Sequence, residues 1–149
     1  MEFTTNEDDQ RKAAQLKARL AEASDETGIK KDGPRVPNVT IAEGRHKYVL
    51  MSACLPGGTE RQNFVVSREF AAYHKDAAEP MVEKLESSGY SSIRILGGGR
   101  LFLDSNNETI AIYGYSYGFG LADHALSKAV IQRDSRYENF DISWSNEGY

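Results

Sequence analysis

One stretch decides the fold of this 149-residue chain: Ile112-Tyr-Gly-Tyr-Ser-Tyr-Gly-Phe-Gly120. Alternating apolar residues up to Ile112 predict a strand, and the glycines that follow break it into a loop. From about Leu121 the pattern becomes that of a helix. The backbone N–H groups of a glycine-bearing turn between a strand and a helix can converge on a phosphate or another oxyanion. A purely structural turn, whose glycines only supply positive φ angles, is the alternative.

Apolar runs on both sides of this stretch, separated by turn residues, predict about six strands and two helices. We expect the strands at residues 46–55, 62–66, 92–96, 100–104, 108–115 and 141–144, and the helices around 81–88 and 121–132. The strand at 92–96 is expected to stop at the triple glycine that precedes Arg100. Because hairpins dominate, the predicted fold is α+β, with a mixed, mostly antiparallel sheet and two helices behind a flexible N-terminal extension.

His74 is expected at or just before the start of the first of these helices. Asp76 followed by Glu79 resembles a capping box, and Pro80 is tolerated only near a helix start. Gly89 stands where a C-terminal cap belongs. A histidine in this position lies beside unpaired helix N–H groups, which favour a bound anion.

Residues 1–44 differ in composition from the rest, with seven Lys or Arg and nine Asp or Glu residues. Leu16 and Leu20 share one face of a possible helix, but so thin an apolar stripe does not stabilise a helix alone in water. The segment 30–37 contains two prolines and a glycine and is typical of a linker. We therefore predict a solvated, mobile extension over 1–44, partly helical or disordered, and a compact domain over 45–149. A helix that docks on a partner is the alternative for the extension.

Composition excludes several classes of function. The net charge is −4 and the isoelectric point about 5.4, so we expect no binding to nucleic acid or to an anionic membrane. A single cysteine, Cys54, forbids an intramolecular disulfide and favours a reducing compartment. The acidic N-terminus resembles neither a signal peptide nor a transit peptide, and the uncharged run at 109–122 is too short to span a bilayer. We expect a cytoplasmic monomer.

Three histidines, His46, His74 and His124, have side chains able to act as a base near neutral pH. Lys47 and Arg100 supply cationic donors near the predicted glycine turns. A histidine, cations and a glycine-rich loop together suit the handling of phosphate, because the charge on phosphoryl oxygens needs both N–H donors and cations.

The order of these residues strengthens that interpretation. Along the chain come Lys47-Tyr-Val-Leu, Tyr73-His74, Leu96-Gly-Gly-Gly-Arg100, Tyr113-Gly-Tyr-Ser116 with Gly120 and His124, and the ending Ser143-Trp-Ser-Asn-Glu-Gly-Tyr149. In combination these motifs resemble the small phosphohistidine phosphatases, the family that includes the Janus-type proteins. The resemblance covers about residues 45–149. It implies a metal-independent enzyme without a cofactor, which hydrolyses the P–N bond of histidine-phosphorylated proteins or peptides.

The resemblance also implies roles for individual residues. His74 is implied to be the catalytic histidine, acting as a base on water or attacking phosphorus itself. The implied substrate-binding residues are Lys47, Arg100, Ser116, Tyr117, Gly118 and His124, with the backbone N–H groups of residues 116–118 on the phosphoryl oxygens. One position departs from the family. An arginine usually stands eight residues before the catalytic histidine, whereas this chain has Val66 there and Arg68 two residues later.

Other interpretations of the same residues fail on spacing or stay open. Cys54 has Arg61 downstream, but six residues intervene where cysteine-dependent phosphatases have five, so a buried core thiol is the better interpretation. His46 lacks the following glycine of the Arg-His-Gly signature in phosphoglycerate-mutase-like phosphatases. Trp144 is expected in the core. A module that binds phosphorylated partners in the same pocket without turnover remains the alternative to an enzyme.

Overall fold

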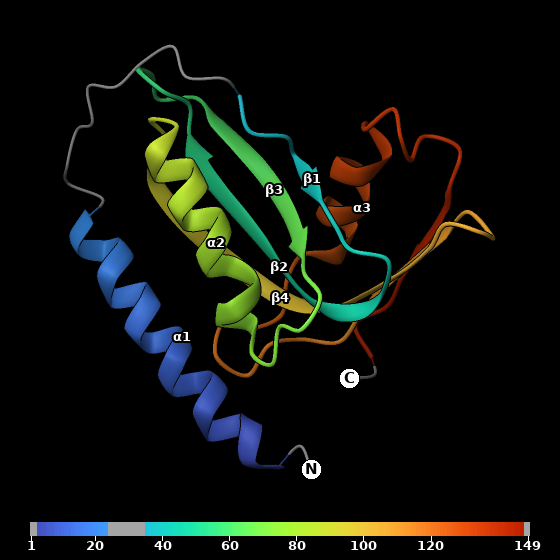
Figure 1. Cartoon of the computed structure of the whole chain (residues 1–149), viewed down its shortest axis with the longest axis horizontal. Helices are drawn as coiled ribbons and strands as arrows, with labels where there is room; N and C mark the ends of the chain where they lie inside the picture. Colours follow the sequence, from blue (N-terminus) through green and yellow to red (C-terminus); the bar gives the residue numbers. More distant parts are fainter. Residues whose placement is uncertain (1–2, 24–34, 148–149) are drawn as a thin grey trace.

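The chain folds as one mixed sheet with helices on both of its faces (Figure 1). The computed structural model describes residues 3–23 and 35–147. Within these residues the helices are α1 (Phe3–Ala23), α2 (His74–Ser87) and α3 (His124–Gln132). The strands are β1 (Val39–Thr40), β2 (Gly44–Cys54), β3 (Arg61–Ser67), β4 (Ser91–Asp104), β5 (Thr109–Tyr113) and β6 (Asp141–Trp144).

The six strands follow the order β1-β3-β2-β4-β5-β6 across the sheet. β2 and β4 occupy the centre and pair antiparallel with each other and with β3 and β5. The two outer strands, β1 and β6, pair parallel with β3 and β5. The predicted α+β fold with a mixed, mostly antiparallel sheet is confirmed. α1 adds a third helix to the two that were predicted for the domain.

Helices cover both faces of the central strands. α1 and α2 lie side by side on one face, and α3 lies on the other (Figure 1). Along β2, Val49 and Met51 join the apolar cluster beneath α1 and α2, whereas Tyr48 and Leu50 join the cluster beneath α3. All four side chains are fully buried. This two-sided burial explains why β2 is apolar at successive positions rather than at alternate ones.

The triple glycine, Gly97–Gly99, does not end a strand as predicted. It lies inside β4, which runs for 14 residues and has a register shift against β2 just before Gly97. These glycines permit close approach rather than a turn. A Cβ on Gly98 would lie 2.9 Å from the His74 ring, and one on Gly99 would lie 2.9 Å from the His124 ring. β4 therefore replaces two predicted strands, while β1 is a short strand that the sequence pattern did not predict.

The same glycines seat the loop that follows β5. Gly98 N donates to Gly120 O at 3.0 Å, and Ala122 N donates to Gly98 O at 3.3 Å. A Cβ on Gly97 would lie 2.7 Å from the Ala122 backbone. Ser116 and Gly120 close the loop with two backbone hydrogen bonds of 3.1 and 2.8 Å. The loop therefore runs directly along β4, which brings Ser116 next to the first turn of α2.

α1 packs on the domain, so the prediction of a solvated extension is wrong for the described part of residues 1–44. Leu16 and Leu20 are buried in the apolar cluster that they share with α2. Burial of each leucine contributes about 1.5–3 kcal/mol, which a lone helix in water lacks. Residues 24–34, which include most of the expected linker at 30–37, lie outside the described part of the chain. The domain boundary at residue 44 stays a prediction.

Three local expectations need correction. α2 begins at His74, as expected, but its capping box is formed by Tyr73 and Asp76 rather than by Asp76 and Glu79, and Pro80 lies inside the helix. Asp76 closes the first turn by accepting from the backbone N–H of the N-cap residue at 3.0 Å. Cys54 is half-buried at the end of β2 rather than in the core. Trp144, also expected in the core, is 44% exposed at the end of β6.

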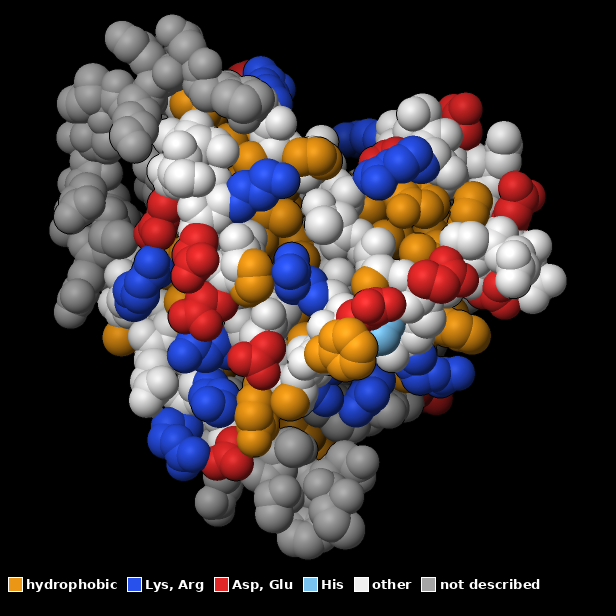
Figure 2. All heavy atoms as spheres, in the orientation of Figure 1, with side chains coloured by type: hydrophobic (Ala, Val, Ile, Leu, Met, Phe, Trp, Pro, Cys, Tyr) orange, Lys and Arg blue, Asp and Glu red, His pale blue; other side chains and the backbone are white. Residues whose placement is uncertain are grey.

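The surface carries charges of both signs. On the face shown in Figure 2, Lys and Arg side chains are interspersed with Asp and Glu side chains. This mixture agrees with the small net charge of −4. None of the helices in the described part of the chain is long and apolar enough to cross a membrane.

We predict that Gly99→Ala destabilises the protein by about 1–3 kcal/mol, the usual cost of overpacking a close contact. The added Cβ would meet the carbonyl oxygen of Tyr113 and the His124 ring. Urea unfolding measures the change in the free energy of unfolding. Gly58→Ala is the matched control, because no atom lies within 4 Å of a Cβ at that position. Its free energy of unfolding should stay within about 0.5 kcal/mol of the parent value, and equal effects of the two substitutions would contradict the close-approach explanation.

Candidate anion-binding site

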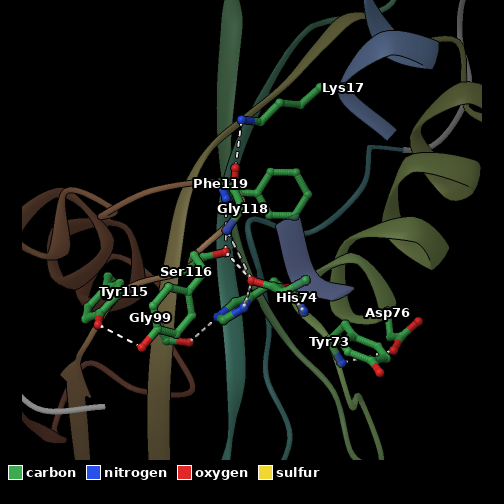
Figure 3. A network of polar contacts seen from close by, with 11 residues as sticks. Lys17, Tyr73, His74, Asp76, Gly99, Tyr115, Ser116, Gly118 and Phe119 are labelled. Atoms are coloured by element: carbon green, nitrogen blue, oxygen red, sulfur yellow. Dashed lines mark hydrogen bonds and ion pairs between the residues drawn. The ribbon is translucent and has the colours of Figure 1, made fainter. Parts of the chain in front are cut away.

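His74 is the first residue of α2 and is fully buried. Its Nε2 lies 3.0 Å from the carbonyl oxygen of Gly99 (Figure 3). Because a carbonyl oxygen only accepts, Nε2 carries the proton in the neutral ring and Nδ1 keeps its lone pair. The imidazole is therefore held in one orientation, with Nδ1 as the nitrogen available for chemistry.

Three hydrogen-bond donors converge beside that ring: the backbone N–H of His74, the hydroxyl of Ser116 and the backbone N–H of Gly118. The first belongs to the N-terminus of a 14-residue helix, and the other two belong to the loop seated on β4. Figure 3 shows these three residues gathered at one place. A helix N-terminus and loop N–H groups that point at one place form a binding site for an anion.

Two cations lie on the same side of the sheet as this site. Lys47 of β2 and Arg100 of β4 stand directly opposite each other in the antiparallel register. Side chains alternate along a strand, so Arg100 shares the face of Gly98, the face on which the His74 ring packs. Lys47 shares the face of Val49, which belongs to the apolar cluster beneath α2. The structure thus brings both predicted cations to the face that carries His74.

His124 lies on the opposite face of β4, against Gly99. Its Nε2 donates to the carbonyl oxygen of Gly114 at 2.8 Å, and its Nδ1 accepts from the Tyr48 hydroxyl at 2.6 Å. The Tyr48 hydroxyl in turn accepts from Ser127 Oγ at 3.0 Å. His124 therefore holds the turn at Gly114, where the loop begins, from behind the sheet. It supports the loop without sharing the face of His74.

The other predicted residues fall around the site or away from it. Tyr117 is half-buried and packs edge-on against Tyr115, with 5.1 Å between the ring centroids. Val66, where the family usually has an arginine, is buried in the sheet. Arg68 is exposed and lines a separate groove between β1 and the loop that precedes α2.

One acidic side chain that the sequence did not single out occupies the anion site. Asp9 of α1 is only 1% exposed. Its Oδ1 accepts from the His74 backbone N–H at 3.1 Å, and its Oδ2 accepts from Ser116 Oγ and Gly118 N, both at 3.2 Å. Oδ2 also faces His74 Nδ1 at 3.4 Å. The Asp9 carboxylate thus engages all three donors of the site.

These contacts favour the charged form of Asp9. Burial by itself raises the pKa of Asp9, but the adjacent His74 side chain and hydrogen bonds from the backbone N–H groups of His74 and Gly118 hold the pKa below its usual value. A sequence signal for this placement exists: Asp9, Ala13, Leu16 and Leu20 follow one another at spacings of four, three and four residues. A carboxylate within an otherwise apolar helix face needs a buried partner, so this pattern indicates a docked helix.

The donor set suits an anion and an imidazole rather than a metal cluster. Among the described residues, no group of three or more His, Cys, Asp or Glu side chains is placed to hold a metal ion. An anion site beside an imidazole lone pair suits transfer of a phosphoryl group, whose oxygens take the donors while the nitrogen faces phosphorus or the attacking water. The expectation of a metal-independent reaction stays a prediction.

Comparison with known proteins gives a family match. The model of the Janus/Ocnus family (Ocnus) matches residues 34–141. A Sus scrofa protein named 14 kDa phosphohistidine phosphatase is 34% identical over 124 residues, covering 79% of this chain and 96% of that protein. The Homo sapiens protein of the same name is 33% identical over 120 residues, with 76% and 94% covered. Sex-regulated protein janus-B of Drosophila orena is 32% identical over 111 residues, with 74% and 79% covered.

We predict that His124 makes the protein less stable in mild acid. Burial lowers the pKa of His124 in the folded state, an effect that the Gly114 carbonyl and the Asp123 charge only partly offset. Below the ordinary histidine pKa of about 6.5, the unfolded chain therefore binds a proton that the folded chain does not. The free energy of unfolding should fall as the pH drops from 7.5 to 5.5, by at most about 1.4 kcal/mol per pH unit from this group.

Urea unfolding of the parent and of His124→Gln at both pH values measures this contribution, because the other titrating groups are common to the two proteins. The parent should lose more stability than the variant between pH 7.5 and pH 5.5. The same loss in both proteins would contradict the assignment of His124 as a neutral core residue.

Proposed function

The chain belongs to the Janus/Ocnus family, and on that basis we propose that it is a protein histidine phosphatase that hydrolyses the P–N bond of phosphohistidine. The observation that carries the proposal is the convergence of three N–H or O–H donors beside His74 Nδ1. The two relatives named phosphohistidine phosphatase, which align with more than three quarters of this chain, support it.

In the proposed complex the donors of the site hold the substrate's phosphoryl group. Its oxygens accept hydrogen bonds from the His74 backbone N–H, the Ser116 hydroxyl and the Gly118 backbone N–H. Lys47 and Arg100 offset the remaining negative charge. This arrangement fixes phosphorus beside the imidazole, so an attacking group can approach in line with the P–N bond.

His74 then supplies the base. Its Nδ1 takes a proton from water as the water oxygen bonds to phosphorus, the P–N bond breaks, and the leaving imidazole of the substrate takes up a proton from solvent. The hydrogen bond from Nε2 to Gly99 supports this role, because it keeps the lone pair on Nδ1. Direct attack by Nδ1 on phosphorus is the second route and gives a phosphoenzyme that water hydrolyses afterwards.

A non-catalytic module that binds phosphorylated partners is the second candidate function. Similarity to proteins named sex-regulated protein janus-B, a name that mentions no phosphatase, favours it. Such a module needs the donors and the cations, but it does not need the His74 lone pair. Turnover that depends on the His74 ring therefore separates the two candidates.

We predict that His74→Ala lowers kcat on a phosphohistidine peptide at least about a hundredfold, the usual effect of losing a positioned proton acceptor. The assay uses the full chain with a chelator present, which should leave the parent rate unchanged. Circular dichroism establishes that the variant is folded. The control is His46→Ala on β2, where the side chain lies 2.7 Å from the Glu43 carbonyl oxygen and outside the site.

The control should keep kcat within about twofold of the parent value, as surface substitutions away from a site usually do. Parent-like turnover by folded His74→Ala would remove His74 from the reaction. Phosphate binding without turnover by the parent would instead favour the binding module.

We also predict that Arg100→Ala lowers kcat/KM about 10- to 100-fold, because a hydrogen bond to a charged group contributes about 1.5–3 kcal/mol. Arg94→Ala is the matched control, since it removes the same charge from an exposed position on the same strand. Its kcat/KM should change less than about twofold at physiological ionic strength. Equal losses in both variants would mean that net charge, rather than a contact from Arg100, attracts the substrate.

A further inference from the structure

α1 spans both walls of the anion site. Lys17 Nζ donates to the carbonyl oxygen of Gly118 at 2.8 Å, on the loop that follows β5 (Figure 3). The Tyr73 hydroxyl, next to the first residue of α2, donates to Asp8 Oδ2 at 3.2 Å. Between these two contacts the Asp9 carboxylate enters the site. α1 therefore lies where a substrate must approach.

Asp9 makes the contacts that the proposed function assigns to a phosphoryl group. A carboxylate and a phosphoryl group both present anionic oxygens that accept several hydrogen bonds. The backbone N–H of His74 and the two loop donors are all taken by Asp9 oxygens. Because each of these donors has one hydrogen to give, Asp9 and a phosphoryl group compete for the same place.

We propose that α1 is an internal pseudosubstrate: Asp9 fills the phosphoryl site, and a phosphorylated partner binds only after α1 has moved away. This regulation rests on the proposed function, because the same donors serve both anions. Its chemical consequence is competition between the Asp9 carboxylate and a dianionic phosphoryl group for one site.

The geometry of His74 argues against Asp9 as a catalytic partner. Nε2 already donates to Gly99 at 3.0 Å, so the ring needs no second group to orient it. Asp9 Oδ2 instead faces Nδ1, the nitrogen with the lone pair, at 3.4 Å. The docked carboxylate therefore stands in front of the lone pair that the proposed reaction uses, in the place that water or phosphorus would take.

A separate observation shows that α1 packs directly against Gly118, where a side chain would not fit. A Cβ at Gly118 would meet Ala13 Cβ and would lie 2.7 Å from the Asp9 carbonyl oxygen. Absence of a side chain there lets the helix backbone rest directly on the loop. The family model begins at residue 34, so α1 lies before the matched region. The contact of α1 with Gly118 therefore lies outside what the family model describes.

Few apolar side chains hold α1 on the domain, so α1 can be released from it. Its described apolar contacts come from Ala13, Leu16 and Leu20. The ion pair from Arg19 to Glu86 of α2 is partly exposed on both sides, and exposed pairs hold weakly. A helix attached in this way can exchange between docked and released states, and a phosphorylated ligand shifts the population toward release.

Two measurements on the full chain test the proposal. NMR titration through the amides of His74 and Gly118 gives the dissociation constant of inorganic phosphate, and steady-state assays give kcat/KM on a phosphohistidine peptide. Asp9→Asn puts an NH2 group against N–H and O–H donors, so it should release α1. It should tighten phosphate binding and raise kcat/KM, each about tenfold, as expected if α1 is docked for about nine-tenths of the time.

Gly118→Ala is the second variant, because it keeps the loop N–H and displaces α1 by its Cβ. It should change both quantities in the same direction as Asp9→Asn. Asp141→Asn is the matched control: it removes the same charge from an exposed position on β6, away from α1 and the site. Both of its quantities should stay within about twofold of the parent values.

Unchanged phosphate affinity in both Asp9→Asn and Gly118→Ala overturns the proposal. A tenfold fall in kcat of Asp9→Asn without tighter phosphate binding also overturns it and makes Asp9 a positioning residue for His74. Tighter phosphate binding with no turnover in any variant supports the occlusion by α1 and contradicts the phosphatase activity. Turnover by the parent, together with phosphate affinities that are unchanged in both variants, supports the phosphatase activity and contradicts the occlusion by α1.

Discussion

Gly97–Gly99 lie at the centre of the sheet, where three parts of the chain come within 3 Å of the positions that their Cβ atoms would occupy. The backbone at Ala122 approaches Gly97. The His74 ring approaches Gly98, and the His124 ring approaches Gly99. A side chain at any of them would push away α3, the loop or the start of α2. The packing on both faces of β4, and with it the geometry of the anion site, depends on this absence of side chains.

The hydrogen-bond donors of the anion site are buried and need acceptors. Its donors sit at a helix N-terminus and on a loop, and a buried donor without an acceptor costs about 1–3 kcal/mol. Asp9 supplies the acceptors, while Leu16 and Leu20 supply apolar burial beside α2. Neither contribution alone holds a helix of this composition, but the two together account for its docking. The chemistry that suits the site to a phosphoryl group is thus the chemistry that draws α1 onto it.

Much of the candidate site was readable from motifs. Lys47, His74, Arg100 and Ser116 were expected near a bound phosphate, and the structure places all four on one side of the sheet. The triple glycine was misread as a strand end, because glycine serves both turns and close approach, and the approaching partner is remote in sequence. α1 was misjudged for a related reason. The stabilisation that two leucines on one helix face provide depends on whether another part of the fold buries them, and the helix sequence does not show this.

By itself the sequence determined the α+β class, the mixed sheet and the resemblance to a phosphatase family, since these follow from the period of apolar residues and the order of motifs. Only the tertiary structure decided on which face each histidine lies, with His74 beside the anion site and His124 behind the sheet. It alone decided that Asp9 enters that site. Donors from residues 74, 116 and 118 meet one carboxylate only after β4, the loop and α1 have packed, and local periodicity carries no information about which distant segments complement one another.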